Sequence, residues 1–112
     1  RDPKINAYAI IIHMNIIKEL NNAELTLRLE GELNSVTASE FEEVIKTDLN
    51  KVTSLIIDLE KLSYLSSAGL RVLLVAQKIM SKNGKMVIRH VNEEVMEIFS
   101  LTGFSNVLDI EA

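Results

Sequence analysis

Two short apolar runs, residues 55–59 and 86–88, constrain the fold of this chain more than any other feature. Each has the length of a strand, and its apolar residues stand next to one another, which is typical of strands buried on both faces. Segments with helical spacing of apolar residues lie between the two runs and after the second one. Strands that alternate with helices in this way predict an α/β domain with a mixed sheet.

Three helices are predicted from their end signals as well as from their periodicity. Thr37 and Glu40 have the spacing of a capping box, so a helix is expected to begin there. A second helix is expected over about 68–82. Asn92 can cap a third helix, and Gly103 is a stop signal for it.

A pair of strands is expected to open the domain. Residues 16–20 form the first strand, and the asparagines at 21–22 can turn the chain. Residues 25–29 alternate leucine with polar residues, which is the period of a half-buried strand, and Gly31 ends or bulges this strand. A last short strand is expected over 107–110. With a simple strand order, the right-handed crossover rule places the helices on one face of the sheet.

Composition limits what this chain can do. Its 112 residues fit one domain, and the absence of cysteine excludes disulfides, thiolate metal sites and a cysteine nucleophile. The formal net charge of −4 and the 4% aromatic content argue against nucleic acid as a partner. No apolar run has the roughly 18 residues of a membrane-spanning helix. We therefore expect no nucleic-acid partner and no direct insertion into a membrane.

Two interpretations stay open for residues 1–13. They are a leader that a vector or an upstream extension encodes, with Met14 as the natural start, or they form an extra edge strand. A signal peptide is not favoured, because the apolar stretch is short and no small-residue cleavage pattern follows it. The folded domain is expected to comprise residues 14–112.

The helix predicted over 68–82 is apolar around most of its circumference, which is more than one covered face needs. Either the helix is wedged between its neighbours, or part of its apolar face is exposed and meets a partner. Partial exposure of Leu70, Val72 and Val75 would favour the second interpretation.

Two serines stand at the start of this helix, directly after a predicted strand. Ser66 or Ser67 can cap the helix by accepting from a first-turn N–H group. Alternatively, one of them is a regulatory phosphoserine, because a helix N-terminus tolerates the added negative charge. The two roles can coexist.

The sequence offers little for catalysis. The two histidines, His13 and His90, do not form a set with a serine and an acid, and the glycines are isolated rather than gathered in a phosphate-binding loop. Glutamate and histidine residues do not cluster at metal-ligand spacing. We expect no enzyme activity, no cofactor and no metal.

Three stretches of the chain together resemble the STAS domain, and most of all the free-standing bacterial anti-sigma factor antagonists. These stretches are residues 31–38 (GELNSVTA), 55–59 (LIIDL) and 64–70 (YLSSAGL). The resemblance runs from about residue 14 to residue 110. It implies a mixed, largely parallel sheet that an antiparallel pair opens, with the helices mainly on one face.

The resemblance also implies a function. The relatives bind an anti-sigma factor that is also a serine kinase, and so release a sigma factor in the cytoplasm. The kinase phosphorylates a serine, which ends binding, and a phosphatase restores it. Aligned on Gly69, the phosphorylated serine is Ser67, with Ser66 as a competing acceptor. The partner-binding residues implied are Asn34, Ser35, Thr37, Ser66, Ser67, Ala68, Gly69, Leu70 and Arg71.

Two positions depart from the family's pattern. Ser66 stands where the family usually has an aspartate before the phosphoserine, and Asn34 replaces the aspartate of the first stretch. Both replacements remove negative charge near Ser67, so repulsion toward a phosphate there is weaker. An alternative function is that of small STAS subunits that dock on the ATPase of lipid-transporting ABC systems. The oligomeric state stays open.

Overall fold

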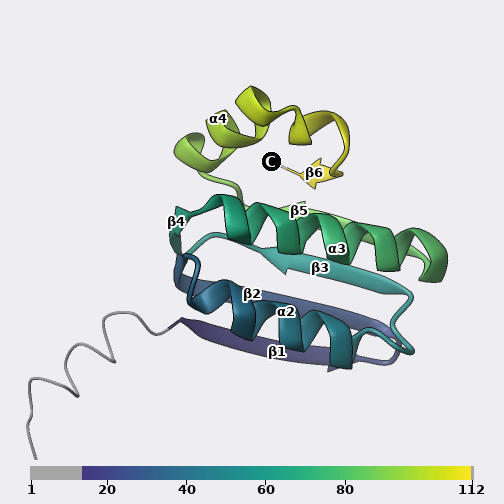
Figure 1. Ribbon diagram of the computed structural model, residues 1–112. Coiled ribbons are helices and arrows are strands. Elements are labelled where there is room, and N and C mark those ends of the chain that lie inside the picture. The colour runs from purple at the N-terminus through teal and green to yellow at the C-terminus, as the bar shows by residue number, and fades with distance from the viewer. Residues whose placement is uncertain (1–13, 112) are drawn as a thin grey trace, which may run out of the picture.

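The computed structural model describes residues 14–111, which form one layer of sheet covered by helices (Figure 1). In chain order the elements are β1 (Asn15–Asn21), β2 (Glu24–Leu33), α2 (Thr37–Asp48), β3 (Ser54–Asp58), β4 (Leu62–Leu65), α3 (Ser67–Asn83), β5 (Lys85–Arg89), α4 (Glu93–Thr102), the short 3-10 helix η1 (Phe104–Asn106) and β6 (Ile110–Glu111). The two interpretations of residues 1–13, and His13 with them, lie outside the described residues.

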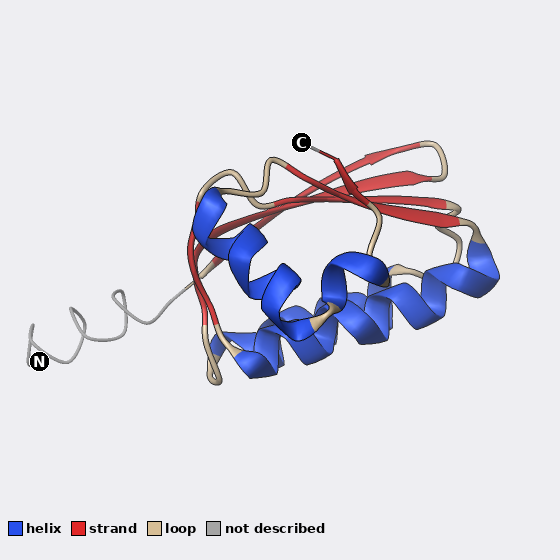
Figure 2. Cartoon of the chain, turned by 90° about the horizontal axis from the view of Figure 1, so that it is seen from above, coloured by secondary structure: helices blue, strands red, loops and turns tan. Residues whose placement is uncertain are grey.

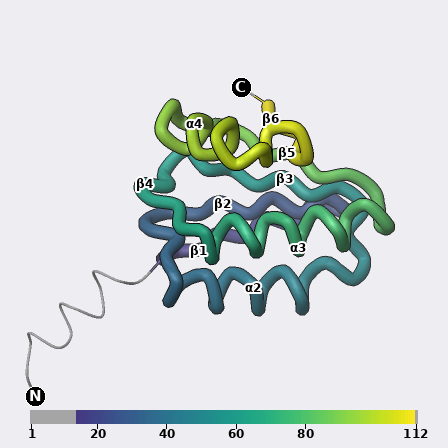
Figure 3. The backbone as a smooth tube through the Cα atoms, turned by 45° about the horizontal axis from the view of Figure 1, so that its top comes forward, coloured from purple at the N-terminus to yellow at the C-terminus, as the bar shows by residue number. Residues whose placement is uncertain are grey.

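The sheet has the strand order β1-β2-β3-β5-β6, and β4 pairs with β2 beside this path. The pair β1-β2 is antiparallel, and all other pairs are parallel. The helices all lie on one face of the sheet (Figure 2). Along that face, α3 lies between α2 and α4 (Figure 3). The predicted fold class, a mixed sheet with helices on one face, is confirmed.

The core lies between the sheet and the helices. The leucines of β2 that face the helices, Leu25, Leu27 and Leu29, are buried, as the alternating pattern predicts. In β3, Leu55 and Ile57 are buried, but Ile56 points to the other face and is only half-buried. The prediction that this run is buried on both faces is therefore wrong. Ile56 is only half-buried because no helix of the described chain covers the second face of the sheet.

The strand β4 was not predicted from the sequence. It has only four residues, its ends Leu62 and Leu65 are buried, and Ser63 and Tyr64 between them are exposed. It pairs with the last residues of β2, beyond a shift of register between Gly31 and Glu32. Of the two alternatives for Gly31, an end of the strand or a bulge, the structure shows the bulge, which lets one long strand pair with β3 along its first half and with β4 at its end.

The chain end also differs from the prediction. The last strand is Ile110–Glu111 rather than 107–110, because η1 occupies the preceding residues and the Val107 N–H donates to the carbonyl of Phe104. The predicted cap of α4 is confirmed, since Asn92 Oδ1 accepts from the Val95 N–H at 2.8 Å. Gly103, with φ of 82°, ends that helix as expected.

The helix α3 is wedged among its neighbours. Leu70 and Val72 are buried, and Val75 is half-buried against the core. The interpretation that an exposed apolar face of this helix meets a partner is thus not supported by Leu70 and Val72. None of the helices in residues 14–111 is long and apolar enough to cross a membrane.

Candidate functional site

The start of α3 and the loop before α2 lie side by side at the carboxyl edge of the sheet. The strands β2 and β4 end in register there, with Leu33 opposite Leu65. The Ser66 N–H donates to the Leu33 carbonyl at 2.9 Å, so the two strand-to-helix junctions are joined by a backbone hydrogen bond. This edge brings together sequence stretches that are about thirty residues apart, and every predicted site residue lies on it or on the first turns of the helices that follow.

Asn34 and Thr37 hold the loop between β2 and α2 in shape. Asn34 Oδ1 accepts from the N–H groups of Val36 and Thr37, both at 2.9 Å. Thr37 Oγ1 donates to the Glu32 carbonyl and accepts from the Asn34 N–H. Both side chains therefore organise the loop from within.

The predicted capping box at this helix is wrong. Thr37 is the first residue of α2, the N-cap position is Val36, and no side chain bonds the helix from that position. The Thr37 hydroxyl is directed back toward β2, and Asn34 supplies the acceptor for the first N–H groups instead. The reason is that the backbone is already helical at Val36, with φ of −79° and ψ of −51°, so Thr37 does not take the extended conformation that a capping box requires.

Ser66 and Ser67 have different roles in the structure. Ser66 is the N-cap of α3: its backbone is extended and its Oγ accepts from the Gly69 N–H at 3.2 Å. Ser67 is the first helical residue and is exposed, whereas Ser66 is half-buried. The capping role that the sequence left open between the two serines belongs to Ser66. Of the two serines, Ser67 is the more exposed.

Gly69 lets the helix start sit directly on the strand ends. A Cβ atom at this position would lie 2.6 Å from Leu33 Cγ and 2.9 Å from Leu65 Cδ1. Both distances are far below van der Waals contact, so a larger residue requires the side chains of Leu33 and Leu65, or α3 itself, to shift. The glycine thereby sets the position of Ser66 and Ser67 relative to the neighbouring loop.

The predicted partner-binding residues divide into three groups by burial. Ser35, Ser67 and Arg71 are exposed, and Asn34, Ser66 and Ala68 are half-buried. Thr37, Gly69 and Leu70 are buried, so they position the site from below.

Two exposed apolar residues at this edge were missed from the sequence. Val36 keeps 59% and Tyr64 keeps 51% of its surface accessible, and they stand in the loop before α2 and in β4. The available signal was that both residues stand inside the stretches 31–38 and 64–70 that carry the family resemblance. Tyrosine is one of the residue types enriched at protein interfaces.

An ion-pair network spans the exposed side of α2 and α3. Arg71 Nη2 lies 3.0 Å from Glu42 Oε1, and Lys46 Nζ lies 3.1 Å from Glu42 Oε2. Hydrogen bonds from Lys46 and then from Arg71 hold the pKa of Glu42 below its ordinary value of 4.5. Glu42 is therefore the charged centre between the two cations.

A second polar cluster lies at the ends of β3 and β5. The side chains of Asp58, Glu60 and His90 have ligand atoms within 4.8 Å of one another, so the fold brings Glu60 and His90 together although they are far apart in the sequence. The parallel pairing of β3 with β5 is the reason, since it places Asp58 opposite Arg89 and next to His90.

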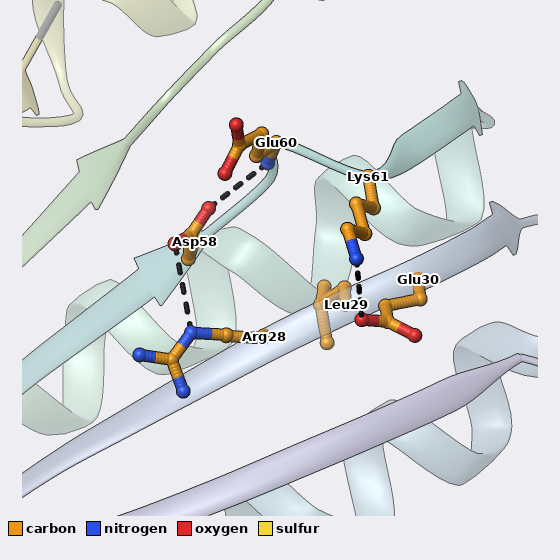
Figure 4. Close-up of a pocket in the computed structure, with 6 residues that line it drawn as sticks. All are labelled: Arg28, Leu29, Glu30, Asp58, Glu60 and Lys61. Atoms are coloured by element: carbon orange, nitrogen blue, oxygen red, sulfur yellow. Dashed lines mark hydrogen bonds and ion pairs between the residues drawn. The ribbon is translucent and has the colours of Figure 1, made fainter.

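The oxygens of Asp58 already have partners within the protein. Oδ1 accepts from the Glu60 N–H and lies 3.1 Å from His90 Nδ1, while Oδ2 lies 3.8 Å from Arg28 Nε. A pocket of about 190 Å³ lies beside these groups (Figure 4). Lys61 and Glu30, which also line it, lie 3.9 Å apart at their charged atoms. The cluster is a network of paired charges at the surface.

The comparisons with known proteins give the family directly. The STAS domain family matches residues 15–112. The chain belongs to the STAS domain family. This STAS domain is 34% identical over 84 residues to BtrV of Bordetella bronchiseptica, a protein named provisionally as an anti-sigma factor antagonist, and the match covers 73% of this chain and 72% of BtrV. It is 28% identical over 103 residues to the anti-sigma-B factor antagonist of Listeria monocytogenes, with 88% and 90% covered.

Solved structures share the fold. The STAS domain superposes on an anti-sigma factor antagonist from Mycobacterium paratuberculosis with a TM-score of 0.79 and 21% identity, covering 88% of this chain and 85% of that one. It superposes on phosphorylated SpoIIAA, a Bacillus cell fate determinant, with a TM-score of 0.68 and 18% identity, covering 89% and 92%. At these identities the structures support the fold alone.

Proposed function

We propose that this STAS domain is an anti-sigma factor antagonist, a protein-binding module that sequesters an anti-sigma factor and so releases a sigma factor. The observation that carries the proposal is the exposed Ser67 at the first position of α3, at the same end of the sheet as the exposed Val36 and Tyr64. The proposal is supported by the name of the Listeria relative, which aligns over most of both chains. A module that regulates transcription in this way works in the cytoplasm and needs no catalytic group of its own.

The partner surface in this proposal is the edge formed by the loop 34–36, Tyr64 and the first turn of α3. The apolar side chains Val36 and Tyr64 supply area that binding removes from water. Asn34 and Ser66 are neutral, whereas the exposed Glu32 beside Asn34 and the exposed Arg71 near the start of α3 present charge to a partner.

Phosphorylation of Ser67 is the proposed switch. The anti-sigma factor, acting as a serine kinase, transfers the γ-phosphoryl group of ATP to Ser67 Oγ. The bond to the bridging oxygen breaks, ADP leaves, and the hydroxyl proton passes to a base of the kinase. The product carries a charge of roughly −1.5 to −2 on this surface. A bound partner would have to desolvate this charge, so binding ends, and a phosphatase restores it by hydrolysis with water.

Capture of the partner tests the proposal. Immobilised wild-type protein, Ser67→Ala and Ser67→Glu are incubated with lysate of the native host, and bound proteins are identified by mass spectrometry. We expect wild type and Ser67→Ala to retain an anti-sigma factor with a kinase domain. The amount that Ser67→Glu retains should be smaller by a factor of about ten or more, because the glutamate places charge in a desolvated interface. Ser105→Glu is the matched control, because Ser105 is exposed in η1, outside this edge.

The same experiment separates the alternative function. Capture of a transporter ATPase, in equal amounts by wild type and Ser67→Glu, would overturn the proposal in favour of a transporter subunit. Equal capture of the anti-sigma factor by both variants would retain the binding function but reject Ser67 as the switch.

A further inference from the structure

Ser67 and Arg71 stand one helical turn apart on the exposed side of α3. Residues separated by four positions on a helix are surface neighbours, so their side chains can interact. Both residues are exposed, and the Arg71 side chain keeps 61% of its surface accessible. In the unmodified protein the guanidinium is directed toward α2, where it pairs with Glu42 at 3.0 Å. Arg71 therefore lies between the proposed phosphorylation site and a carboxylate of the neighbouring helix.

Glu42 does not depend on Arg71 alone. Its second oxygen is 3.1 Å from Lys46, which stands one turn further along the same helix. If Arg71 turned away, Lys46 would still pair with the carboxylate. Exposed ion pairs also contribute little to stability, so exchanging one of them is not costly. The network thus contains a cation that can change its partner.

We propose that Arg71 receives the phosphoryl group on Ser67, and that it leaves Glu42 when Ser67 is phosphorylated. This inference rests on the proposed function, since it requires the phosphoryl group at that serine. A phosphate offers roughly −1.5 to −2 charges and three acceptor oxygens, whereas the Glu42 carboxylate offers one charge and two oxygens. The planar guanidinium forms paired hydrogen bonds with phosphate, which favours arginine as the recipient.

The exchange would extend the effect of phosphorylation across the surface. Contact between the phosphate and Arg71 breaks the ion pair that joins α3 to α2 at Glu42. A partner would then meet a changed charge pattern on both helices rather than at Ser67 alone. The switch would consequently act on residues that the phosphoryl group does not touch.

The test uses protein in which phosphoserine is incorporated at position 67 during synthesis, so that no kinase is needed. The second ionisation of the phosphate is followed by ³¹P NMR, and the ionisation of Glu42 by ¹³C NMR of its carboxyl group. We expect the second phosphate pKa to be lower by about 0.5 in the wild-type background than in Arg71→Gln, because the nearby cation favours the dianion. Phosphorylation should also raise the pKa of Glu42, which loses one of its two cations.

Two further variants make the test specific. Arg71→Lys retains the positive charge but not the planar guanidinium group, so it should lower the second phosphate pKa by only part of the wild-type amount. Lys78→Gln removes an exposed cation further along the same helix and should leave the phosphate pKa unchanged. The inference would be overturned if the second phosphate pKa were equal in wild type and Arg71→Gln and phosphorylation left the pKa of Glu42 unchanged.

These measurements report the contact and not the binding of any partner. The proposed function is tested separately by capture with the Ser67 variants. Loss of capture without a contact between the phosphate and Arg71 would reject this inference and retain the function.

Discussion

At the scale of the residue, the close approach at Gly69 decides where the site lies. Gly69→Ala adds a Cβ only 2.6 Å from Leu33 Cγ, so α3 or Leu33 must move. Overpacking of this kind costs about 1–3 kcal/mol, and alanine recovers up to about 1 kcal/mol through its higher helix propensity. We expect urea denaturation to show a net loss of about 1–2 kcal/mol, together with weaker partner capture. Lys78→Ala, an exposed change on the same helix, should stay within about 0.5 kcal/mol. If Gly69→Ala had the same free energy of unfolding as the wild type, the packing argument would be contradicted.

At the scale of the element, Asn92 both caps α4 and attaches it to the strand that carries the site. Its Oδ1 accepts from the Val95 N–H, and its Nδ2 donates to the Leu62 carbonyl at 3.2 Å. Asn92→Ala loses both bonds and should destabilise by about 1–2 kcal/mol, while Asn92→Asp keeps the cap and should lose about 1 kcal/mol or less. Thermal unfolding of the two variants checks the order. An equal loss in both would mean that the bond to Leu62, rather than the cap, holds this helix.

At the scale of the whole molecule, exposed ion pairs link the elements and make stability depend on pH. Lys18 Nζ lies 2.8 Å from Asp48 Oδ2 and joins β1 to α2, as Arg71 and Glu42 join α3 to α2. A hydrogen bond from Lys18 lowers the pKa of Asp48 from its ordinary 3.8, and Lys46 and Arg71 lower that of Glu42. Both carboxylates bind fewer protons when folded than when unfolded, so their stabilisation is present above these ordinary values.

That stabilisation should be lost as the pH falls from about 4.5 through the lowered values. Urea denaturation across this range is expected to show the fall, and Lys18→Gln should reduce it by removing the cause of the Asp48 shift. A wild-type profile that is flat below this pH would exclude both ion pairs as contributors. An exposed ion pair contributes little to the free energy of unfolding, so the effect of each single variant should be small.

The local pattern of the sequence determined most of the fold. Three features follow from neighbouring residues alone: the alternating leucines of β2, the cap and stop of α4, and the bulge at Gly31. Their causes are the two-residue period of a strand, helix capping and the conformational freedom of glycine, and each of these acts over a few positions. The stretch that contains Ser67 was also recognisable, since its motif is continuous along the chain.

Only the tertiary structure decided the rest. It showed that one face of the sheet is uncovered, that the four residues of β4 pair with the end of β2, and that Ser66 rather than Ser67 caps α3. It also brought Arg71 to Glu42 and His90 to Asp58. These contacts join residues about thirty positions apart, and no local period specifies them, because they depend on which strands pair and in which register.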